Sequence, residues 1–420
     1  MHRSLPFLTC ITLIIILGTG CRDNPTRPGS DTGTAEVVVT TDGPDRGADG
    51  YVLVIDETSE EQVPTSGRED VEEQWTEATS LQLGAGSHDI QLTAVARNCT
   101  VEGDNPVEVT IKSGETANIT FDIRCKAALN NKIVLVSDRD GPFDLYVAEP
   151  GARPGEGLSD YERLTHDDYP ESHPAISSDG TRIAYVSDGN IWVMNADGTG
   201  VTQLTDSGTD TEPTWYSEND RIAFTSRRDE IQQIYVMHAD GSDQKRIVTE
   251  NPLYAADGKD RTNPLYEGTS GSDYDLVATM GQGEDAEIVF IDEDSDGDGL
   301  MDMTNNDHFD GYPAWSPDGR EILIVTEDAD GVKNLRIIDA EKGDTQSTSD
   351  FPRGFIDAQA YPVWSPDGTE ILFTSVAQAG ADMSVMAKDY NSSRSNKPST
   401  EIDTDIRDFN VLHVVWSPAF

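Results

Sequence analysis

The fold of this chain is decided by a phrase that occurs twice almost unchanged, as YPAWSPDGREILIVT at residues 312–326 and as YPVWSPDGTEILFTS at residues 361–375. Looser copies read HPAISSDGTRIAYVS at 173–187, EPTWYSENDRIAFTS at 212–226 and HVVWSPAF at 413–420, and a degenerate copy begins at Asn263. The tryptophan position of the six copies is held by Ile176, Trp215, Tyr266, Trp315, Trp364 and Trp416. Intervals of about 40–50 residues between such copies are typical of the blades of a β-propeller.

Each copy contains the signals of four short antiparallel strands. The Pro-x-Trp strand is followed by Ser-Pro-Asp-Gly, a turn in which proline fixes φ and glycine accepts a positive φ. A second strand of the type RIAFTS (221–226), a third of the type IYVM (234–237) and a fourth that ends in Leu-Thr come next. Four such strands make one propeller blade.

The two ends of the repeat region complement each other. Strands of the second type start at Ile133, Ile183, Ile222, Leu276, Ile322 and Ile371. The first of these has no Pro-x-Trp strand before it, and the strand at Trp416 has no second strand after it. We expect these two strands to pair and close a ring, because closure removes free sheet edges. The sequence therefore predicts an all-β protein with a six-bladed β-propeller over residues 132–420.

The strings PAWSPDGREILIVT (313–326) and IWVMNADGTGVTQLT (191–205) resemble the TolB-type, WD40-like (PD40) propeller repeats. The resemblance covers residues 132–420 and implies the propeller fold. TolB itself carries an α/β domain before its propeller, whereas the preceding residues of this chain have strand patterns. The chain therefore resembles the repeat family without being TolB itself, and the role and partners of TolB are not carried over.

Residues 35–125 alternate apolar and polar residues in the manner of short strands separated by turns. Their order resembles the Ig-like or prealbumin-like accessory domains of bacterial surface proteins, which implies a small β-sandwich that serves as a spacer. Cys99 and Cys125 lie in this segment, and two cysteines in an exported chain allow one disulfide. Two buried free thiols are the alternative.

The N-terminus has the features of an export signal. A basic start precedes an apolar run from Leu5 to Leu17, which is shorter than the roughly 20 residues of a bilayer-spanning helix. Gly20-Cys21 resembles the bacterial lipoprotein signal, which implies a signal peptide over 1–20 and a lipidated Cys21. It also implies a place in the cell envelope, at the outer membrane or in the periplasm rather than at the inner membrane. Residues 21–34 are predicted to form a flexible tether; an ordinary signal peptide is the alternative.

An acidic segment between the third and fourth strands of the fourth blade reads DSDGDGLMD at residues 294–302. Calcium prefers about six to eight oxygen ligands, and carboxylates at alternate loop positions can point inward together. The segment resembles EF-hand, dockerin and thrombospondin-type loops, which implies a structural Ca²⁺ held by Asp294, Asp296, Asp298, the Leu300 carbonyl and Asp302. Position twelve is Asn305 instead of glutamate. A register that begins at Asp292 and a plain acidic turn are the alternatives.

The chain of 420 residues has 78 Asp and Glu against 30 Lys and Arg, a net charge of −48. Such a surface repels phosphate, so nucleic acid is excluded as a ligand, and a lipid anchor is the only membrane contact that we expect. The charge favours cations and basic partners. Glu171, Asp210 and Asp310 each stand three residues before a repeat proline. We expect them to ring one mouth of the central channel and to bind a basic peptide segment, with plain acidic loops as the alternative.

The sequence contains no G-x-S-x-G elbow, no histidine pair at zinc spacing and no P-loop. It therefore predicts a non-catalytic, lipid-anchored envelope protein whose propeller is a scaffold for an envelope protein, a peptide or another ligand. The alternative is a propeller enzyme that acts on carbohydrate in a glycosidase-like or lyase-like manner. Glycoside hydrolysis needs only two carboxylates, and this chain has many.

Overall fold

The computed structural model describes residues 31–43, 51–63, 74–149, 159–216, 220–247, 251–258, 276–291, 300–328, 330–340, 345–346, 361–376, 383–389, 400–401 and 411–417. Within these ranges the secondary structure is strand, apart from one 3₁₀ turn at Gly283–Asp285. No helix in this part of the chain is long and apolar enough to cross a membrane. The prediction of an all-β chain is confirmed. The predicted signal peptide and Cys21 lie outside the described residues.

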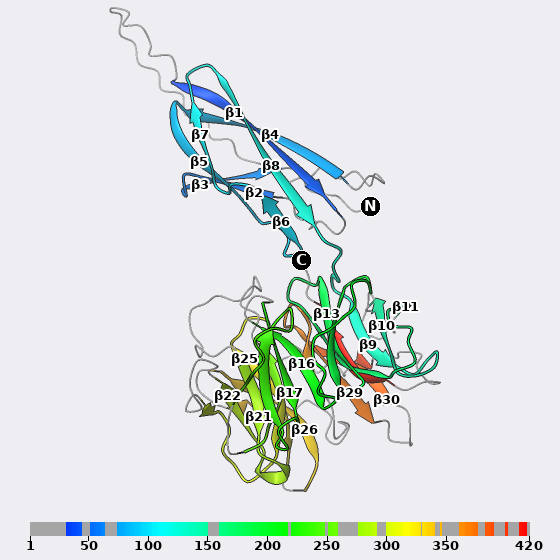
Figure 1. The fold of residues 1–420 in the computed structure, drawn as a ribbon. Helices are drawn as coiled ribbons and strands as arrows, with labels where there is room; N and C mark the ends of the chain where they lie inside the picture. Colours follow the sequence, from blue (N-terminus) through cyan, green and yellow to red (C-terminus); the bar gives the residue numbers. More distant parts are fainter. Residues whose placement is uncertain are drawn as a thin grey trace, which may run out of the picture.

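The N-terminal part of the chain contains two four-stranded sheets (Figure 1). One has the order β4 (Gln74–Gly84), β1 (Thr32–Asp42), β8 (Thr116–Cys125) and β6 (Cys99–Glu102), and the other has the order β3 (Ser59–Val63), β2 (Tyr51–Ile55), β5 (Gly86–Thr93) and β7 (Val107–Ile111). Val37 and Phe121 of the first sheet share one buried core with Leu53 and Ile90 of the second. The segment is therefore a two-layer sandwich, and its Ig-like or prealbumin-like relationship stays a prediction.

The sandwich begins inside the segment predicted to be tether. Strand β1 starts at Thr32, and Gly33 pairs with Leu83 of β4. A Cβ atom on Gly33 would lie 2.3 Å from the backbone oxygen of Lys112, so this close approach of two backbones requires glycine. The Gly-Thr composition is that of a linker, which is why the sequence pattern placed the boundary three residues too late.

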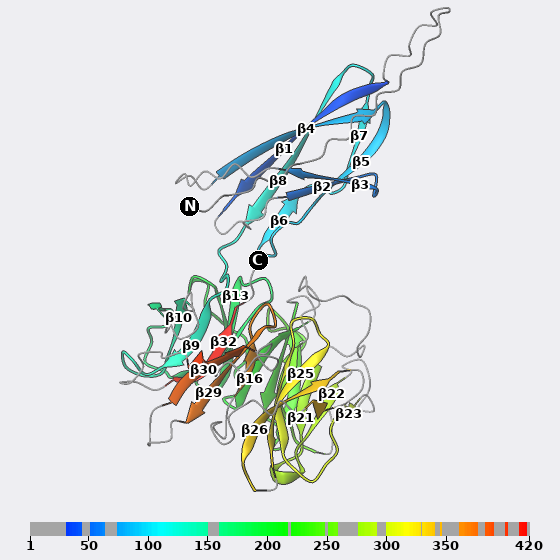
Figure 2. The same ribbon diagram turned by 180° about the vertical axis from the view of Figure 1, so that it is seen from behind.

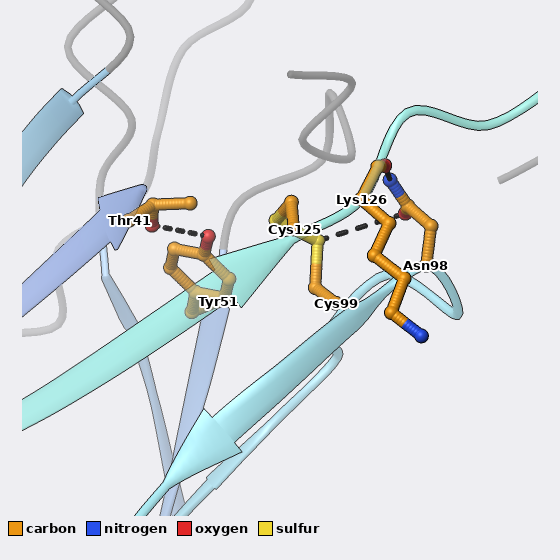
Figure 3. The surroundings of a disulfide bond; sticks show 6 residues. All are labelled: Thr41, Tyr51, Asn98, Cys99, Cys125 and Lys126. Atoms are coloured by element: carbon orange, nitrogen blue, oxygen red, sulfur yellow. Dashed lines mark hydrogen bonds between the residues drawn. A yellow bond between two sulfur atoms is a disulfide. The ribbon is translucent and has the colours of Figure 1, made fainter. Parts of the chain in front are cut away.

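A disulfide joins Cys99 of β6 to Cys125 of β8, as predicted (Figure 3). The two residues are direct partners in the antiparallel ladder. Next to the bond, the Lys126 N–H donates to the Asn98 carbonyl (3.0 Å), and the Asn98 amide donates to the Lys126 carbonyl (2.8 Å). These contacts fix the end of the sandwich from which the chain continues into the next domain.

Six four-stranded sheets, the blades, follow within the described residues. Blade 1 contains β9 (Ile133–Ser137), β10 (Asp144–Glu149), β11 (Ser159–Arg163) and β32 (Val411–Trp416); blade 2 contains β12 (Glu171–Ile176), β13 (Arg182–Ser187), β14 (Asn190–Asn195) and β15 (Thr202–Gln203); blade 3 contains β16 (Asp210–Tyr216), β17 (Arg221–Ser226), β18 (Gln233–His238) and β19 (Lys245–Arg246). Blade 4 contains β20 (Leu253–Gly258), β21 (Leu276–Met280), β22 (Glu287–Ile291) and β23 (Leu300–Asp302); blade 5 contains β24 (Asp310–Trp315), β25 (Glu321–Glu327), β26 (Lys333–Asp339) and β27 (Thr345–Gln346); blade 6 contains β28 (Val363–Trp364), β29 (Glu370–Val376), β30 (Met383–Asp389) and β31 (Thr400–Glu401). The innermost strands β32, β12, β16, β20, β24 and β28 contact one another in this order around a ring, which defines a propeller.

The ring is closed by strands from both ends of the propeller. Strand β32 pairs with β9 (Figure 2), and Trp416 lies opposite Ile133 in the ladder. The Trp416 indole N–H donates to the Asn131 side chain (2.9 Å), and the backbone N–H of Lys132 donates to the Ser417 hydroxyl (2.6 Å). The predicted pairing of these two strands is confirmed.

The hydrophobic core of the propeller lies between blades. Six buried clusters occur among the described residues, and each is shared by two neighbouring blades. The repeat tryptophans cross the same boundaries, since the Trp215 indole donates to the Ala175 carbonyl of blade 2 and the Trp364 indole donates to the Ala314 carbonyl of blade 5. The Pro-x-Trp phrase therefore encodes the contact between blades.

The Ser-x-Asp-Gly phrase forms the turn between the first and second strands of a blade. The serine hydroxyl donates to the aspartate two residues later at Ser177, Ser316 and Ser365, over 2.6 to 2.7 Å. The turn of blade 2 also meets the sandwich and the connection that follows it, because Arg97 of the sandwich donates to the Ser178 carbonyl (3.1 Å) and the N–H of Leu129 in the connection donates to the Gly180 carbonyl (2.8 Å). The sandwich is thus attached at the face of the propeller that carries these turns (Figure 1).

The innermost strand of blade 4 differs from the prediction. It is Leu253–Gly258, earlier in the chain than the degenerate copy around Tyr266, which lies outside the described residues. Gly258 pairs with Leu276 and so occupies the tryptophan position of this blade. A Cβ atom there would lie 2.2 Å from the Trp215 carbonyl oxygen, so the position accepts no side chain. Without proline and tryptophan, the copy could not be recognised from the repeat phrase.

Because β32 closes the ring, a charge introduced at a buried position of this strand should strongly destabilise the propeller. Val414 is 2% exposed and packs between blades 1 and 6, whereas Val201 is 51% exposed. Val414→Asp should lower the free energy of unfolding by more than about 3 kcal/mol, because a carboxylate is forced into an apolar core. Val201→Asp is the matched control and should change stability little. Equal melting temperatures of the two variants would show that β32 does not hold the ring together.

Candidate functional site in the central channel

The innermost strands turn one side chain each into the central channel. In blades 1 to 5 their pairing with the second strands is interrupted by a bulge, for example between Thr211 and Thr214 and between Gly311 and Ala314. At the bulge the residue before the repeat proline has a positive φ, 52° at Glu212 and 53° at Tyr312. A bulge bends its strand and re-aims a side chain, and such a φ is uncommon outside glycine.

A cavity of about 130 Å³ lies in the channel. Its wall includes one residue from each blade, here called the channel ring: the bulge residues His413, His173, Glu212, Ala255 and Tyr312, and Tyr361, which holds the same position in the repeat phrase of blade 6. The rest of the wall comes from the two residues that follow each ring residue, which are small or apolar except for Thr214 and Asp257. Since these residues lead toward the Ser-x-Asp-Gly turns, the cavity lies between the channel ring and the turn face of the propeller.

A hydrogen bond crosses the channel at the level of the ring. The Tyr361 hydroxyl of blade 6 donates to Oε1 of Glu212 in blade 3, on the opposite side of the ring (2.7 Å). The other oxygen of Glu212 accepts from the Thr225 hydroxyl (2.7 Å) and from the Ala255 N–H (2.9 Å). Burial, and then the neighbouring Glu212 carboxylate, raise the pKa of Tyr361, so its hydroxyl keeps its proton. This bridge forms a floor beneath the cavity.

Two histidines complete the channel ring. The rings of His173 and His413 lie against each other at a tilt of 38°, with centroids 3.9 Å apart, and both contact the Tyr361 ring (5.4 and 5.2 Å). Burial lowers the pKa of His173. Burial also lowers the pKa of His413, and the proximity of His173 lowers it further. Both imidazoles are therefore neutral at neutral pH.

Asp257 is the second carboxylate of the wall. Its Oδ2 accepts from the backbone N–H of Trp315 in blade 5 (2.7 Å), and its Oδ1 accepts from the Thr214 hydroxyl of blade 3 (3.3 Å). Burial raises the pKa of Asp257 to about 6, although these hydrogen bonds favour the ionised form. Asp257 therefore links three blades and is mostly ionised at neutral pH.

The predicted acidic ring at the channel mouth is wrong. Glu171, Asp210 and Asp310 are 1%, 1% and 0% exposed, and none lines the cavity. Glu171 accepts from the Thr165 hydroxyl (2.8 Å); Asp210 and Asp310 accept from Arg228 and Asn306 in the same way (2.7 Å each). Each residue starts an innermost strand, as expected, but its side chain points into the blades, where it fastens loop to strand.

The channel ring was missed although its residues stand first in each quoted copy: HPAI, EPTW, YPAW, YPVW and HVVW. The other positions of the phrase hold apolar or turn residues, whereas this one holds histidine, glutamate or tyrosine. A position that varies among reactive side chains within a strict repeat was the signal. Ala255 and Asp257 carry no such signal, because the copy in blade 4 has lost the phrase.

Most of the predicted calcium loop lies outside the described residues, including Asp294, Asp296 and Asp298. Leu300 and Asp302 form the outermost strand of blade 4, where Asp302 pairs with Val289. The segment thus joins the third and fourth strands of that blade, as expected. Within the described ranges, no group of three or more His, Cys, Asp or Glu side chains is arranged to hold a metal ion. The calcium site stays a prediction.

No protein-family model matches the chain. Among curated proteins, the chain is 27% identical over 201 residues to the uncharacterized peptidase YuxL of Bacillus subtilis (strain 168), which covers 38% of this chain and only 30% of that protein. Among solved structures, it is similar to TolB from Acinetobacter baumannii, with a TM-score of 0.52 and 17% identity over 69% of this chain and 67% of that one. An oligogalacturonate lyase in complex with manganese has a TM-score of 0.44 and 12% identity, over 63% of this chain and 72% of that one. The chain therefore has a TolB-like propeller, and identities this low, which agree with its not being TolB, show the fold alone.

Buried Glu171 predicts a pH-dependent stability. Burial raises its pKa from 4.5 to about 8, and Asp167 and Asp144 add to the rise, while the Thr165 hydrogen bond opposes it. The folded chain holds this proton more tightly than the unfolded chain does. The stabilisation that results is fully present below the unfolded-state pKa of 4.5, and it is lost as the pH rises through the folded-state pKa of about 8. Glu171→Gln cannot ionise and should keep a higher melting temperature above pH 8, by about 2–4 °C for each kcal/mol regained.

Melting curves between pH 5 and pH 9 would check this expectation. Glu162→Gln, on the exposed side of β11, is the control and should follow the parent chain. If Glu171→Gln loses stability with pH as steeply as the parent, Glu171 is not the group that titrates.

Proposed function

We propose that this chain is a non-catalytic, lipid-anchored protein of the bacterial cell envelope whose propeller binds a protein or another ligand in its central channel. The observation that supports this proposal best is the channel ring. Five of its six members, all but Ala255, place a histidine, glutamate or tyrosine in one cavity. Pockets with a mainly apolar wall and a few convergent polar groups are the usual form of ligand sites.

The state of the polar groups favours binding over catalysis. Both oxygens of Glu212 already accept hydrogen bonds from neutral donors, and Asp257 is held in the same way. The two histidines contact each other and tyrosine, and neither forms a hydrogen bond with a carboxylate among the described residues. Groups held in this way present a fixed surface rather than a nucleophile paired with a base.

The proposed location in the cell envelope rests on the sequence. A diacylated Cys21 would hold the chain at the membrane surface, with the tether and the sandwich as spacers between the lipid and the propeller. We place it at the outer membrane or in the periplasm rather than at the inner membrane. A fatty-acid label that marks the chain and is lost in Cys21→Ser would test the anchor.

One observation favours the alternative, an enzyme that acts on carbohydrate. Asp257, with its pKa raised to about 6, has the property of a general acid, and Glu212 is a second carboxylate in the same wall. Cleavage of an oligosaccharide that is lost in Asp257→Asn would support this alternative and contradict the non-catalytic proposal.

Site-specific photo-crosslinking in envelope extracts tests the proposed function. A photoreactive residue in place of Tyr312, in the channel wall, should capture a partner. The same residue in place of Tyr169, which is 58% exposed outside the channel, is the matched control. A partner captured equally at both positions, or only at Tyr169, would contradict a binding site in the channel.

We also propose that the acidic loop of blade 4 binds a structural Ca²⁺. A ligand that binds only the folded chain raises its melting temperature, by an amount that grows with the ligand concentration. Calcium should therefore stabilise the chain, and a chelator should reverse the effect. Asp296→Asn combined with Asp298→Asn should remove the response, whereas Asp206→Asn on blade 2 should keep it. Melting curves that do not change from micromolar to millimolar calcium would leave only an acidic turn.

A further inference from the structure

We propose that the group bound in the channel is an organic cation, an ammonium or a guanidinium, carried by a lysine or arginine side chain of a partner protein or by a small amine. This inference rests on the proposed function, because it names the chemistry of the same site. It is supported by the charge, the wall and the size of the cavity.

Among the residues that the structure describes, the cavity wall carries carboxylates and no countercharge. Glu212 and Asp257 both line it, and all the hydrogen bonds that they accept come from hydroxyl or backbone N–H groups. Among the described residues, no lysine or arginine contributes to the wall. The other titratable groups that face the cavity are His173, His413, Tyr312 and Tyr361, none of them a cation at neutral pH. Buried charges in proteins are ordinarily paired, so the described part of the wall suits a ligand with a positive charge.

The aromatic part of the wall suits the same partner. The Tyr312 and Tyr361 rings meet at 69° (4.9 Å between centroids), and the His173 and Tyr361 rings meet at 89° (5.4 Å). Rings that stand at steep angles enclose a space on several sides, and the negative faces of aromatic rings attract ammonium and guanidinium groups. Desolvation strengthens this attraction, and the floor formed by the Tyr361–Glu212 bridge closes one side of the space.

The size of the cavity limits the ligand to a single group. Its volume of about 130 Å³ is close to the roughly 150 Å³ of an engineered apolar cavity that binds benzene. This is room for a charged head with a few methylene groups, and it is too small for an oligosaccharide or a stretch of peptide backbone. A partner protein would therefore insert one side chain from the turn face.

Calorimetry on the full chain can test the charge of the ligand with matched probes. Methylguanidinium and butylammonium should bind, whereas their neutral counterparts, methylurea and butanol, should bind at least about tenfold more weakly, the difference expected when a charge-assisted hydrogen bond is lost. Affinity should fall as the pH drops below about 6, because Asp257 then gains its proton. Neutral probes that bind as tightly as the cations would overturn the proposal.

Matched variants locate the site. Asp257→Asn should weaken cation binding about tenfold or more, as should Glu212→Gln, whereas Asp206→Asn should have no effect. Tyr312→Leu keeps an apolar wall without a ring and should weaken binding several-fold. Melting curves without ligand show whether each variant is folded. A folded Asp257→Asn protein with unchanged affinity would overturn the proposal, and so would a folded parent chain that binds neither methylguanidinium nor butylammonium.

Two further measurements are needed. One distinguishes a protein partner from a small amine as the source of the cation, and the other distinguishes failure of the cation proposal from failure of the proposed binding function. A short lysine- or arginine-containing peptide that binds more tightly than the free amines would identify a protein partner; the reverse order would identify a small amine, and either order supports a cation site. Excess butylammonium should also suppress the photo-crosslink at Tyr312. A crosslink that persists would overturn the cation proposal and leave the channel as the binding site, whereas no crosslink at all would contradict the proposed function itself.

Discussion

The propeller depends on one strand pair, β32 with β9, which brings together Lys132 and Ser417, 285 positions apart in the chain. Each of the six interblade cores needs a blade on either side, so an open ring would expose two of these apolar surfaces. The pair also builds the site. His413 belongs to β32, and its ring contact with His173 exists only because β32 lies beside β12 of the second blade.

The repeat phrase assigns separate tasks to neighbouring residues. Tryptophan joins one blade to the next, the serine and aspartate shape the turn, and the residue before proline faces the channel. The bulge makes this division possible, because it takes one residue out of the regular ladder without disturbing the residues that follow. Side chains as different as His173, Glu212 and Tyr361 therefore occupy equivalent places in the same architecture.

The sequence was sufficient for the propeller because the fold is repeated, and repetition makes weak local signals add up. It was insufficient where a residue is placed by contacts outside the phrase. Glu171, Asp210 and Asp310 were expected at the channel mouth because they stand three residues before a repeat proline, yet hydrogen bonds from Thr165, Arg228 and Asn306, none of which belongs to a Pro-x-Trp strand, hold their side chains inside the blades. Gly258 was missed for a similar reason. Its role comes from the close approach of Trp215 in the preceding blade, which no local pattern records. The Cys99–Cys125 pair was predictable because an exported segment with two cysteines leaves one choice.

The hydrogen bond between Tyr361 and Glu212 joins opposite walls, so the channel is a blind socket rather than a tunnel while that bond is in place. Whatever enters must leave by the way it came. A polymer cannot be threaded through the propeller or drawn along it step by step, and only a terminus or a protruding side chain can be inserted. A partner that inserts a side chain as proposed would therefore enter and withdraw on the same side of the propeller.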